Sequence, residues 1–113
     1  MNPGILKDMN RTIPDRERIL SALRSADSDI RRLGVKRLAL FGSVARGDSH
    51  AGSDVDLLVE FNVGEKTYDR FIALSELLES LVGHRVELVT IESLSPFIGP
   101  HILAEATDVL RAA

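Results

Sequence analysis

The chain has 113 residues, which is enough for one compact domain and too few for two ordinary ones. It contains no cysteine, so disulfides, thiol nucleophiles and cysteine-based zinc sites are excluded, and we expect a reducing, cytoplasmic setting. Seventeen acidic against fourteen basic residues leave a formal net charge of −3, which argues against binding to a nucleic-acid backbone as the main activity.

No apolar stretch predicts a membrane-spanning helix. The longest uninterrupted apolar runs, 38–41 and 71–74, have four residues each, whereas a span needs about 18. Residues 1–12 mix polar residues with isolated apolar ones and lack the continuous hydrophobic centre of a signal peptide, so we expect a loose terminus. Neither a membrane nor an exported location is therefore expected.

A first helix is predicted over residues 12–34. Thr12 precedes Pro14 and Asp15, a composition typical of a helix start, because a hydroxyl caps free amides and proline fits an early helical position. Gly34 is a typical end. Apolar residues recur at helical spacing on one face of this segment, namely Ile19, Leu23, Ala26, Ile30 and Leu33. The charged residues between them are interpreted as a solvated face.

Two strands are predicted next. Residues 37–41 are nearly all apolar and stop at Gly42, which is typical of a strand covered on both sides. Residues 54–61 alternate instead, and strand side chains point to opposite faces in turn. One face of this second strand would carry Val55, Leu57, Val59 and Phe61, and the other Asp54, Asp56, Leu58 and Glu60. One face is core, and the other begins with two carboxylates.

The second half of the chain predicts a helix, a strand and a last helix. Phe71, Leu74, Leu78 and Leu81 follow a helical spacing that Gly83 closes. Residues 85–90 read as a strand with Val86 and Leu88 on one face and Arg85, Glu87 and Val89 on the other. Ile102, Leu103, Ala106 and Leu110 predict a short final helix. The fold class is therefore α+β, one domain over residues 1–113 in which helices cover a small mixed sheet.

The pair Asp54 and Asp56 is the first candidate site. Two aspartates at this spacing on one strand would hold their charges roughly 6 to 7 Å apart. Their repulsion is about 2 to 3 kcal/mol at an effective dielectric constant near 20, so a cleft around them would call for a cation. Carboxylates suit Mg²⁺, which prefers oxygen ligands. The alternative is a turn residue, Asp54, beside a solvated strand edge, although Asp56 lies in an apolar strand where aspartate is uncommon.

Gly42 and Ser43 form the second candidate site. A strand that ends in Gly-Ser before a short helical segment exposes backbone amides and a hydroxyl to an incoming phosphate. Arg46 could add a guanidinium contact to phosphate, but an ion pair with a nearby acid such as Asp48 is its commoner role. Lys66 could also reach a triphosphate, or serve solubility alone, and the sequence leaves the two open.

Residues 42–59, with the sequence GSVARGDSHAGSDVDLLV, closely resemble the signature of the DNA polymerase β-like nucleotidyltransferase superfamily. Within it the chain resembles a minimal nucleotidyltransferase, the small partner commonly paired with HEPN-domain toxins. The resemblance implies a polymerase β palm-like fold. It also implies a third carboxylate on a later strand, usually aspartate. Glu87 holds that position here and is one methylene longer, which matters because Mg²⁺ demands near-ideal octahedral geometry.

The resemblance implies nucleotidyl transfer with ATP as donor. Asp54, Asp56 and Glu87 would be catalytic and would hold two Mg²⁺ ions, while Gly42, Ser43 and Arg46 would bind the nucleotide. The AMP group would pass to a hydroxyl, with a tyrosine of a HEPN-type toxin as the expected acceptor, so the chain would be an antitoxin in a homo- or hetero-oligomer. Two alternatives remain: a non-catalytic antitoxin that covers its partner, motivated by Glu87, and an enzyme that modifies a small hydroxyl compound.

The three histidines carry no predicted role. His50, His84 and His101 are scattered along the sequence, and we expect each of them to be a solvated polar residue. The single tyrosine, Tyr68, provides no aromatic platform on which nucleic-acid bases could stack. Direct nucleic-acid binding is therefore not expected from these residues either.

Overall fold

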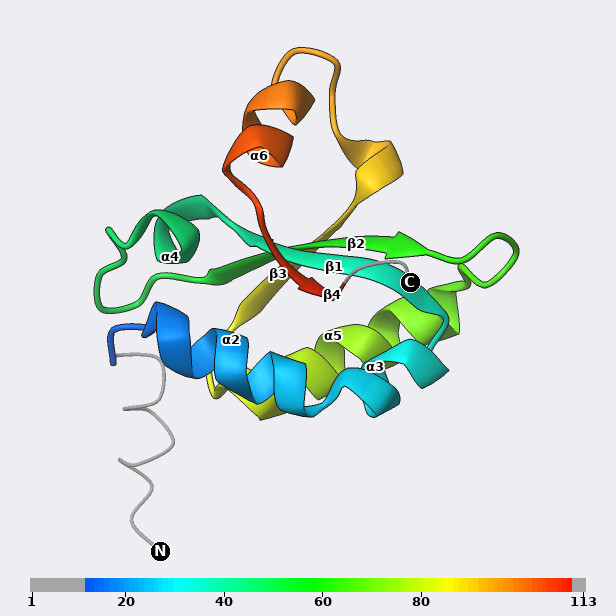
Figure 1. The fold of residues 1–113 in the computed structure, drawn as a ribbon, viewed down its shortest axis with the longest axis horizontal. Coiled ribbons are helices and arrows are strands. Elements are labelled where there is room, and N and C mark those ends of the chain that lie inside the picture. Colours follow the sequence, from blue (N-terminus) through cyan, green and yellow to red (C-terminus); the bar gives the residue numbers. More distant parts are fainter. Residues whose placement is uncertain (1–11, 111–113) are drawn as a thin grey trace, which may run out of the picture.

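The computed structural model describes residues 12–110 and contains one four-stranded sheet (Figure 1). The strands are β1 (Val35–Phe41), β2 (Val55–Phe61), β3 (Val86–Thr90) and β4 (Thr107–Leu110), in the order β3-β2-β1-β4. Strand β1 runs antiparallel to β2 and β4, whereas β2 and β3 are parallel. The predicted α+β class with a mixed sheet is confirmed. The expected loose terminus falls on residues that, apart from Thr12, lie outside the described part.

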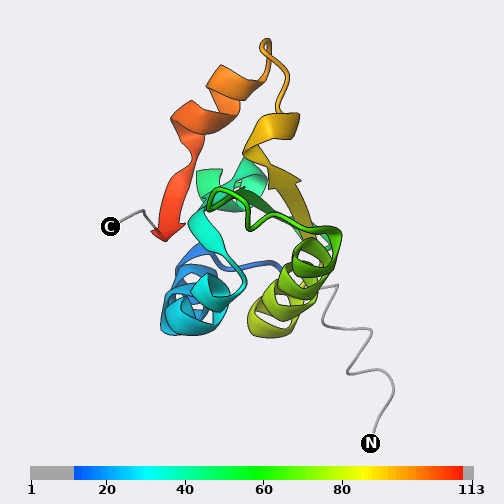
Figure 2. The same ribbon diagram turned by 90° about the vertical axis from the view of Figure 1, so that its right-hand side faces the viewer.

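Three helices cover one face of the sheet: α2 (Arg16–Ser25), α3 (Asp27–Arg32) and α5 (Tyr68–Val82). Figure 2 shows α2 and α5 side by side beneath the strands. The core between them and the sheet contains the fully buried side chains Leu23, Ile30, Leu38, Leu40, Val55, Leu57, Val59, Leu74 and Leu78. Apolar side chains at helical spacing meet alternate side chains of the strands here, which is the packing that the two periodicities predict.

The opposite face of the sheet is covered by shorter elements, the 3₁₀ turn η1 (Ile91–Ser93) and α6 (Gly99–Glu105). Helix α4 (Gly42–Arg46) follows the end of β1 and buries Val44 in the main core. In Figure 2, η1 and α6 rise from this face, away from α2 and α5. A small second core joins them to the sheet, formed by Ala39, Phe41 and Leu58 with the partly buried Val89, Ile91, Leu94, Ile102 and Ala106. Strand β1 is therefore covered on both sides, as its apolar sequence predicts.

The prediction of one continuous first helix is wrong, because the chain breaks at Ala26 between α2 and α3. Ala26 leaves helical geometry at φ −101° and ψ 21°, and its amide donates to the carbonyl of Leu23 at 3.1 Å. The change of direction lets Ile30 remain fully buried beneath the sheet. Apolar spacing alone could not show the break, since Ala26 fits the helical period on both sides of it.

The predicted last helix is also wrong in its second half. Helix α6 ends at Glu105, Ala106 is extended, and Leu110 belongs to β4, which pairs with β1. Ile102 packs in the second core whereas Leu110 packs in the main one, so they lie on opposite faces of the sheet. The free edge of β1 offers unpaired backbone groups, and β4 satisfies them. Within residues 12–110, no helix has the length and apolarity needed to cross a bilayer.

Candidate active site

The strand faces place Asp56 and Glu87 next to each other. They are register partners on the parallel strands β2 and β3, and both point away from the main core. Asp54 precedes β2 by one residue, and the adjoining amide of Val55 donates to the carbonyl of Arg85 at 2.9 Å. The prediction that Asp56 lies opposite the core face of its strand is confirmed, whereas the predicted strand position of Asp54 is wrong, because β2 begins at Val55.

Gly42 lies directly against the carboxylate of Asp56. Strand β1 ends at Phe41, the register partner of Asp56, and the chain turns there into α4 with Gly42 at φ 77°. A Cβ built on Gly42 would lie 3.0 Å from the Asp56 Cγ and collide with one of its carboxylate oxygens. Glycine is required here by its left-handed backbone and by this close approach together. The Gly-Ser segment and the acidic strand are therefore parts of one site.

Asp56 is electrostatically unusual among the described residues. Burial, the charge of Glu87 and the charge of Asp54 raise its pKa from 3.8 to about 6, in that order of importance, while the positive charge of Arg46 opposes the shift. The raised pKa means that the ionised form of Asp56 is poorly stabilised, first because the carboxyl is partly buried and then because other carboxylates are near. A bound cation would stabilise the ionised form.

The donor chemistry of the site suits a hard divalent ion, since Asp54, Asp56 and Glu87 offer only oxygen atoms. Within residues 12–110, no three acidic or histidine side chains are gathered closely enough to form a metal cage as they stand. Asp56 and Glu87 are neighbours on the sheet, and the charges of Glu87 and Asp54 act on Asp56, but the three carboxylates are not arranged as a finished coordination sphere. The fit to a cation therefore rests on charge and ligand type.

Helix α4 presents Gly42 and Ser43 beside the carboxylates. The N-cap residue of α4, Phe41, makes no side-chain capping hydrogen bond, and Ser43 is only partly buried. The Gly42 amide instead donates to Oε1 of Glu105, the last residue of α6, at 3.1 Å. Sequence reasoning missed Glu105. No local pattern marks it, because the contact joins residues 63 positions apart.

Arg46 and Lys66 both have acidic partners. The Arg46 Nε atom lies 3.3 Å from Asp48 Oδ2, and its Nη1 atom lies 3.3 Å from each carboxylate oxygen of Glu105. These hydrogen bonds, with that to Asp48 the larger cause, raise the pKa of Arg46 further. The expected ion pair with Asp48 is confirmed. Lys66 pairs with Glu92 at 2.8 Å.

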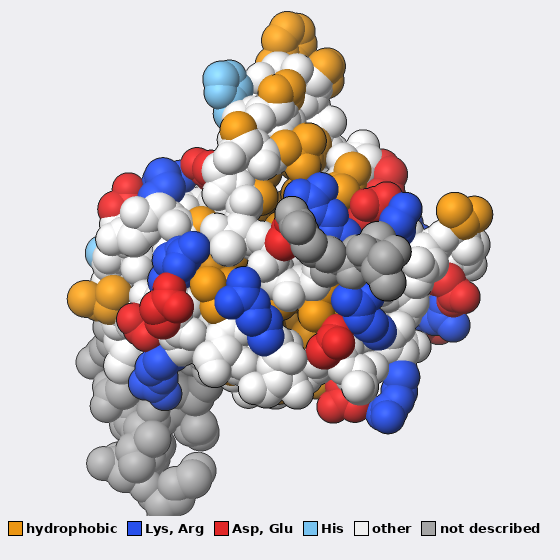
Figure 3. Space-filling view, in the orientation of Figure 1, with side chains coloured by type: hydrophobic (Ala, Val, Ile, Leu, Met, Phe, Trp, Pro, Cys, Tyr) orange, Lys and Arg blue, Asp and Glu red, His pale blue; other side chains and the backbone are white. Residues whose placement is uncertain are grey.

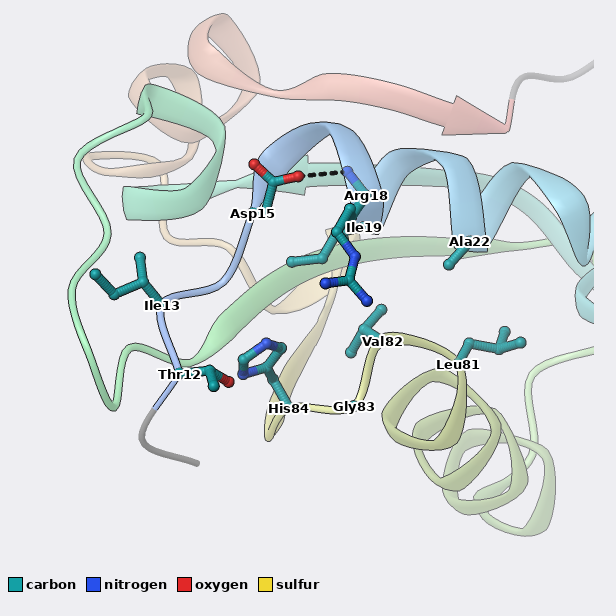
Figure 4. A pocket seen from close by; sticks show the side chains of 10 residues that line it. All are labelled: Thr12, Ile13, Asp15, Arg18, Ile19, Ala22, Leu81, Val82, Gly83 and His84. Carbon is teal, nitrogen blue, oxygen red and sulfur yellow. Dashed lines mark hydrogen bonds between the residues drawn. The ribbon is translucent and has the colours of Figure 1, made fainter. Parts of the chain in front are cut away.

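A hollow of about 180 Å³ adjoins the acidic site and is lined by Gly52, Ser53, Asp54, His84 and Arg85. A larger one of about 490 Å³ lies between α2 and the C-terminal end of α5, with Arg18 and His84 in its wall (Figure 4). His84 lines both. Burial first, and Arg18 second, lower the pKa of His84. His50 and His101 are exposed as expected, whereas His84 is only partly exposed and so fits the expectation of a solvated residue less well.

Residues 17–109 match the model of the nucleotidyltransferase domain family. Two archaeal relatives are similar over most of their length. The protein adenylyltransferase MntA of Thermococcus cleftensis is 40% identical, with 82% of this chain and 94% of that protein covered. A candidate protein adenylyltransferase of Methanocaldococcus jannaschii is 43% identical over 68% of this chain and 82% of its own.

Solved structures show the same fold. A candidate minimal nucleotidyltransferase superposes with a TM-score of 0.73 and 38% identity, covering 82% of this chain and 94% of that one. The fold is also shared with a structure described as a tri-AMPylated Shewanella oneidensis HEPN toxin in complex with MNT antitoxin, at a TM-score of 0.58 and 17% identity, covering 82% of this chain and 73% of the other. The family match, the relatives and the geometry agree: the chain belongs to the nucleotidyltransferase domain family and has the minimal nucleotidyltransferase fold.

Proposed function

We propose that the protein transfers AMP from ATP to a hydroxyl group, with Asp54, Asp56 and Glu87 as the catalytic carboxylates. The observation that carries the proposal is the close approach of Gly42 to Asp56, beside the register pair Asp56 and Glu87. A segment suited to phosphate therefore lies directly beside a group of carboxylates suited to a cation. A triphosphate bound here would contact both.

The residues have separate tasks in this mechanism. The Gly42 amide, the Ser43 hydroxyl and the Arg46 guanidinium bind the β and γ phosphates and fix the α phosphorus in front of the acceptor. Divalent ions such as Mg²⁺, held by the three carboxylates, would supply positive charge against the triphosphate and the leaving group. The acceptor oxygen bonds to the α phosphorus, pyrophosphate leaves, and one carboxylate accepts the hydroxyl proton.

The acceptor we propose is a tyrosine hydroxyl on a HEPN-type toxin partner, in the cytoplasm. Two relatives named for protein adenylyl transfer support a protein substrate. A HEPN-type toxin as the partner is supported by the structure of an AMPylated HEPN toxin in complex with an MNT antitoxin, with which this chain shares a fold. The hollow beside Asp54 has about 180 Å³, which leaves room for a side chain from a partner rather than a large small-molecule acceptor.

The test is label transfer. The purified protein is incubated with its toxin partner, Mg²⁺ and ATP labelled at the α phosphate, and the labelled residue is identified by mass spectrometry. We expect labelled AMP on a partner tyrosine, and a loss of at least about a hundredfold in rate for Asp56→Asn, because a ligand and charge are removed. The matched control is Asp69→Asn, which changes an exposed aspartate in the first turn of α5.

Variants of Glu87 distinguish an antitoxin that transfers AMP from one that only binds and covers its partner. If the glutamate supports catalysis, Glu87→Gln abolishes transfer while Glu87→Asp retains a measurable part of it. Tight binding of the partner with no label transfer in the unaltered protein would contradict the enzymatic proposal and favour an antitoxin that acts by binding. Label on a residue other than tyrosine would contradict the acceptor assignment alone.

A further inference from the structure

Glu105 occupies hydrogen-bond donors that the proposed function assigns to the triphosphate. Its Oε1 accepts from the Gly42 amide at 3.1 Å, and both of its carboxylate oxygens lie 3.3 Å from Arg46 Nη1. A carboxylate and a phosphate oxygen seek the same donors, because each is an anionic acceptor that favours backbone amides and guanidinium groups. Glu105 therefore satisfies, from within the chain, the two groups that would receive an anionic ligand.

We propose that Glu105 is an internal competitor of the nucleotide, an acidic side chain that holds the phosphate-binding groups until a triphosphate displaces it. The inference rests on the proposed function, since it takes Gly42 and Arg46 as contacts to phosphate. The Gly42 amide has one proton, so a full hydrogen bond to a phosphate oxygen replaces the bond to Glu105. The nucleotide must then break both contacts of Glu105 before its own are complete.

The charge of Glu105 acts in the same direction as the hydrogen bonds. Glu105 adds its negative charge to those of Glu87 and Asp54 near Asp56, and it contributes to the raised pKa of Asp56. A triphosphate that approaches Gly42 and Arg46 meets the repulsion of a fourth carboxylate. Binding is therefore weaker while Glu105 points into the site, and a rotation of its side chain is enough to remove both obstacles.

The backbone next to Glu105 supports a rotation of the side chain rather than a displacement of the chain. Glu105 ends α6, and Thr107, two residues later, is already paired with Leu40 of β1. Ala106, between them, packs in the second core. The Glu105 side chain remains about a third exposed, so it can turn toward solvent without opening a cavity. The competitor is thus mobile at its carboxylate and fixed at its backbone.

The experiment measures nucleotide binding to the full chain by calorimetry. Glu105→Gln keeps the shape of the side chain and removes its charge. We expect it to bind ATP, in the presence of Mg²⁺, about three- to tenfold more tightly than the unaltered protein, because a neutral amide oxygen competes more weakly for the two donors than a carboxylate does. Binding of AMP, which lacks the β and γ phosphates, should change less than about twofold, because it does not compete for the same donors.

The matched control is Glu60→Gln, the same chemical change at a strand glutamate of similar exposure that pairs with Lys36 at 3.7 Å near the far end of β2. It should leave ATP binding unchanged. Glu105→Asp keeps the charge but shortens the side chain by one methylene, so it should also bind ATP more tightly if the contact itself competes. Thermal unfolding of each variant shows that the fold is kept.

The outcomes separate this inference from the proposed function. Unchanged or weaker ATP binding by Glu105→Gln would overturn it, and so would an equal gain for AMP or for Glu60→Gln, since either would indicate a general effect of net charge. If the unaltered protein binds ATP and any one of these three results is found, the inference about Glu105 is overturned while the proposed function stands. Absence of ATP binding by every variant would overturn the nucleotide site, and this inference with it.

Discussion

Gly42 links the two parts of the proposed site. Its φ of 77° turns the chain from β1 into α4, and its missing side chain gives room to Asp56. Two separate constraints therefore act on one residue, a backbone conformation and a close approach. They can be separated by experiment, because Gly64 has a similar φ of 78° but open space within 4 Å of the position that a Cβ would occupy.

A comparison of Gly42→Ala with Gly64→Ala tests the close approach. Each change places alanine in a left-handed conformation, which costs about 1 to 2 kcal/mol. Only Gly42→Ala should add a collision with Asp56, so its free energy of unfolding should fall further and its affinity for ATP should drop. Denaturant unfolding and calorimetry measure the two effects. Equal losses in the two variants would show that the collision is relieved without cost.

The pH dependence of stability tests the electrostatic state of Asp56. Its pKa is raised from 3.8 to about 6 on folding, so between those values the folded chain holds a proton that the unfolded chain has released. The contribution of this carboxyl to stability therefore falls as the pH rises through the window and stays reduced above pH 6. Asp56→Asn removes the effect, since asparagine is neutral at every pH.

We expect Asp56→Asn to unfold at a higher temperature than the unaltered protein at pH 8, with the gap shrinking as the pH is lowered toward about 4.5. Thermal unfolding followed by circular dichroism measures the gap. Asp69→Asn, at an exposed site, serves as the control and should show no comparable trend. A gap that is constant with pH would contradict the raised pKa of Asp56.

At the scale of elements, the C-terminal segment decides how the sheet is closed. Strand β4 pairs with the edge of β1, and the Arg37 Nε atom bonds Asp108 Oδ1 at 2.9 Å across this pair. The same segment ends α6 at Glu105, beside α4. Edge pairing and the position of Glu105 are thus coupled, because only one residue, Ala106, separates α6 from β4.

The strand assignment of β4 is tested by two leucines. Leu110 is 4% exposed in β4 and packs in the main core, whereas Leu103 is 41% exposed on α6. Leu110→Ala should lower the free energy of unfolding by about 2 to 5 kcal/mol, and Leu103→Ala by less than about 0.5 kcal/mol. Urea unfolding measures both. Similar values for the two variants would contradict the pairing of β4 with β1.

The two faces of the whole molecule are covered very differently. Helices α2, α3 and α5 close one face of the sheet, while the other carries η1, α6 and the carboxylates of Asp56 and Glu87. Hydrophobic side chains gather on the projection formed by α6 and the loop before it (Figure 3), where Phe97 is 86% and Ile98 55% exposed. The proposed site therefore lies on the side of the sheet that is only partly covered.

Ligand binding at that side should stabilise the whole molecule. A ligand that binds only the folded chain adds about 2.7 kcal/mol at a concentration of 100 times its dissociation constant, which raises the melting temperature of a domain of this size by several degrees. We expect this shift with ATP and Mg²⁺ together, and its loss in Asp56→Asn. Persistence of the full shift in Asp56→Asn would contradict the proposed position of the nucleotide.

Local periodicity accounts for what could be predicted from the sequence. The alternation of residues 54–61 placed Asp56 opposite the core, and the same alternation in residues 85–90 placed Glu87 on the face opposite Val86 and Leu88. Strand side chains alternate between faces whichever strand lies beside them. The signature at residues 42–59 likewise indicated the family that residues 17–109 match. The roles of Ser43, Arg46 and the three carboxylates, and the single-domain organisation, stay predictions.

By itself, the sequence determined the fold class, the faces of the strands and the family. Only the tertiary structure decided the break at Ala26, the order of the strands, the pairing of β4 and the contact of Glu105 with Gly42. The physical reason is the range of the interactions. Helix and strand periods are set between residues two to four positions apart, whereas edge pairing and the Glu105 contact join segments more than 60 positions apart, and they form only when the whole chain packs.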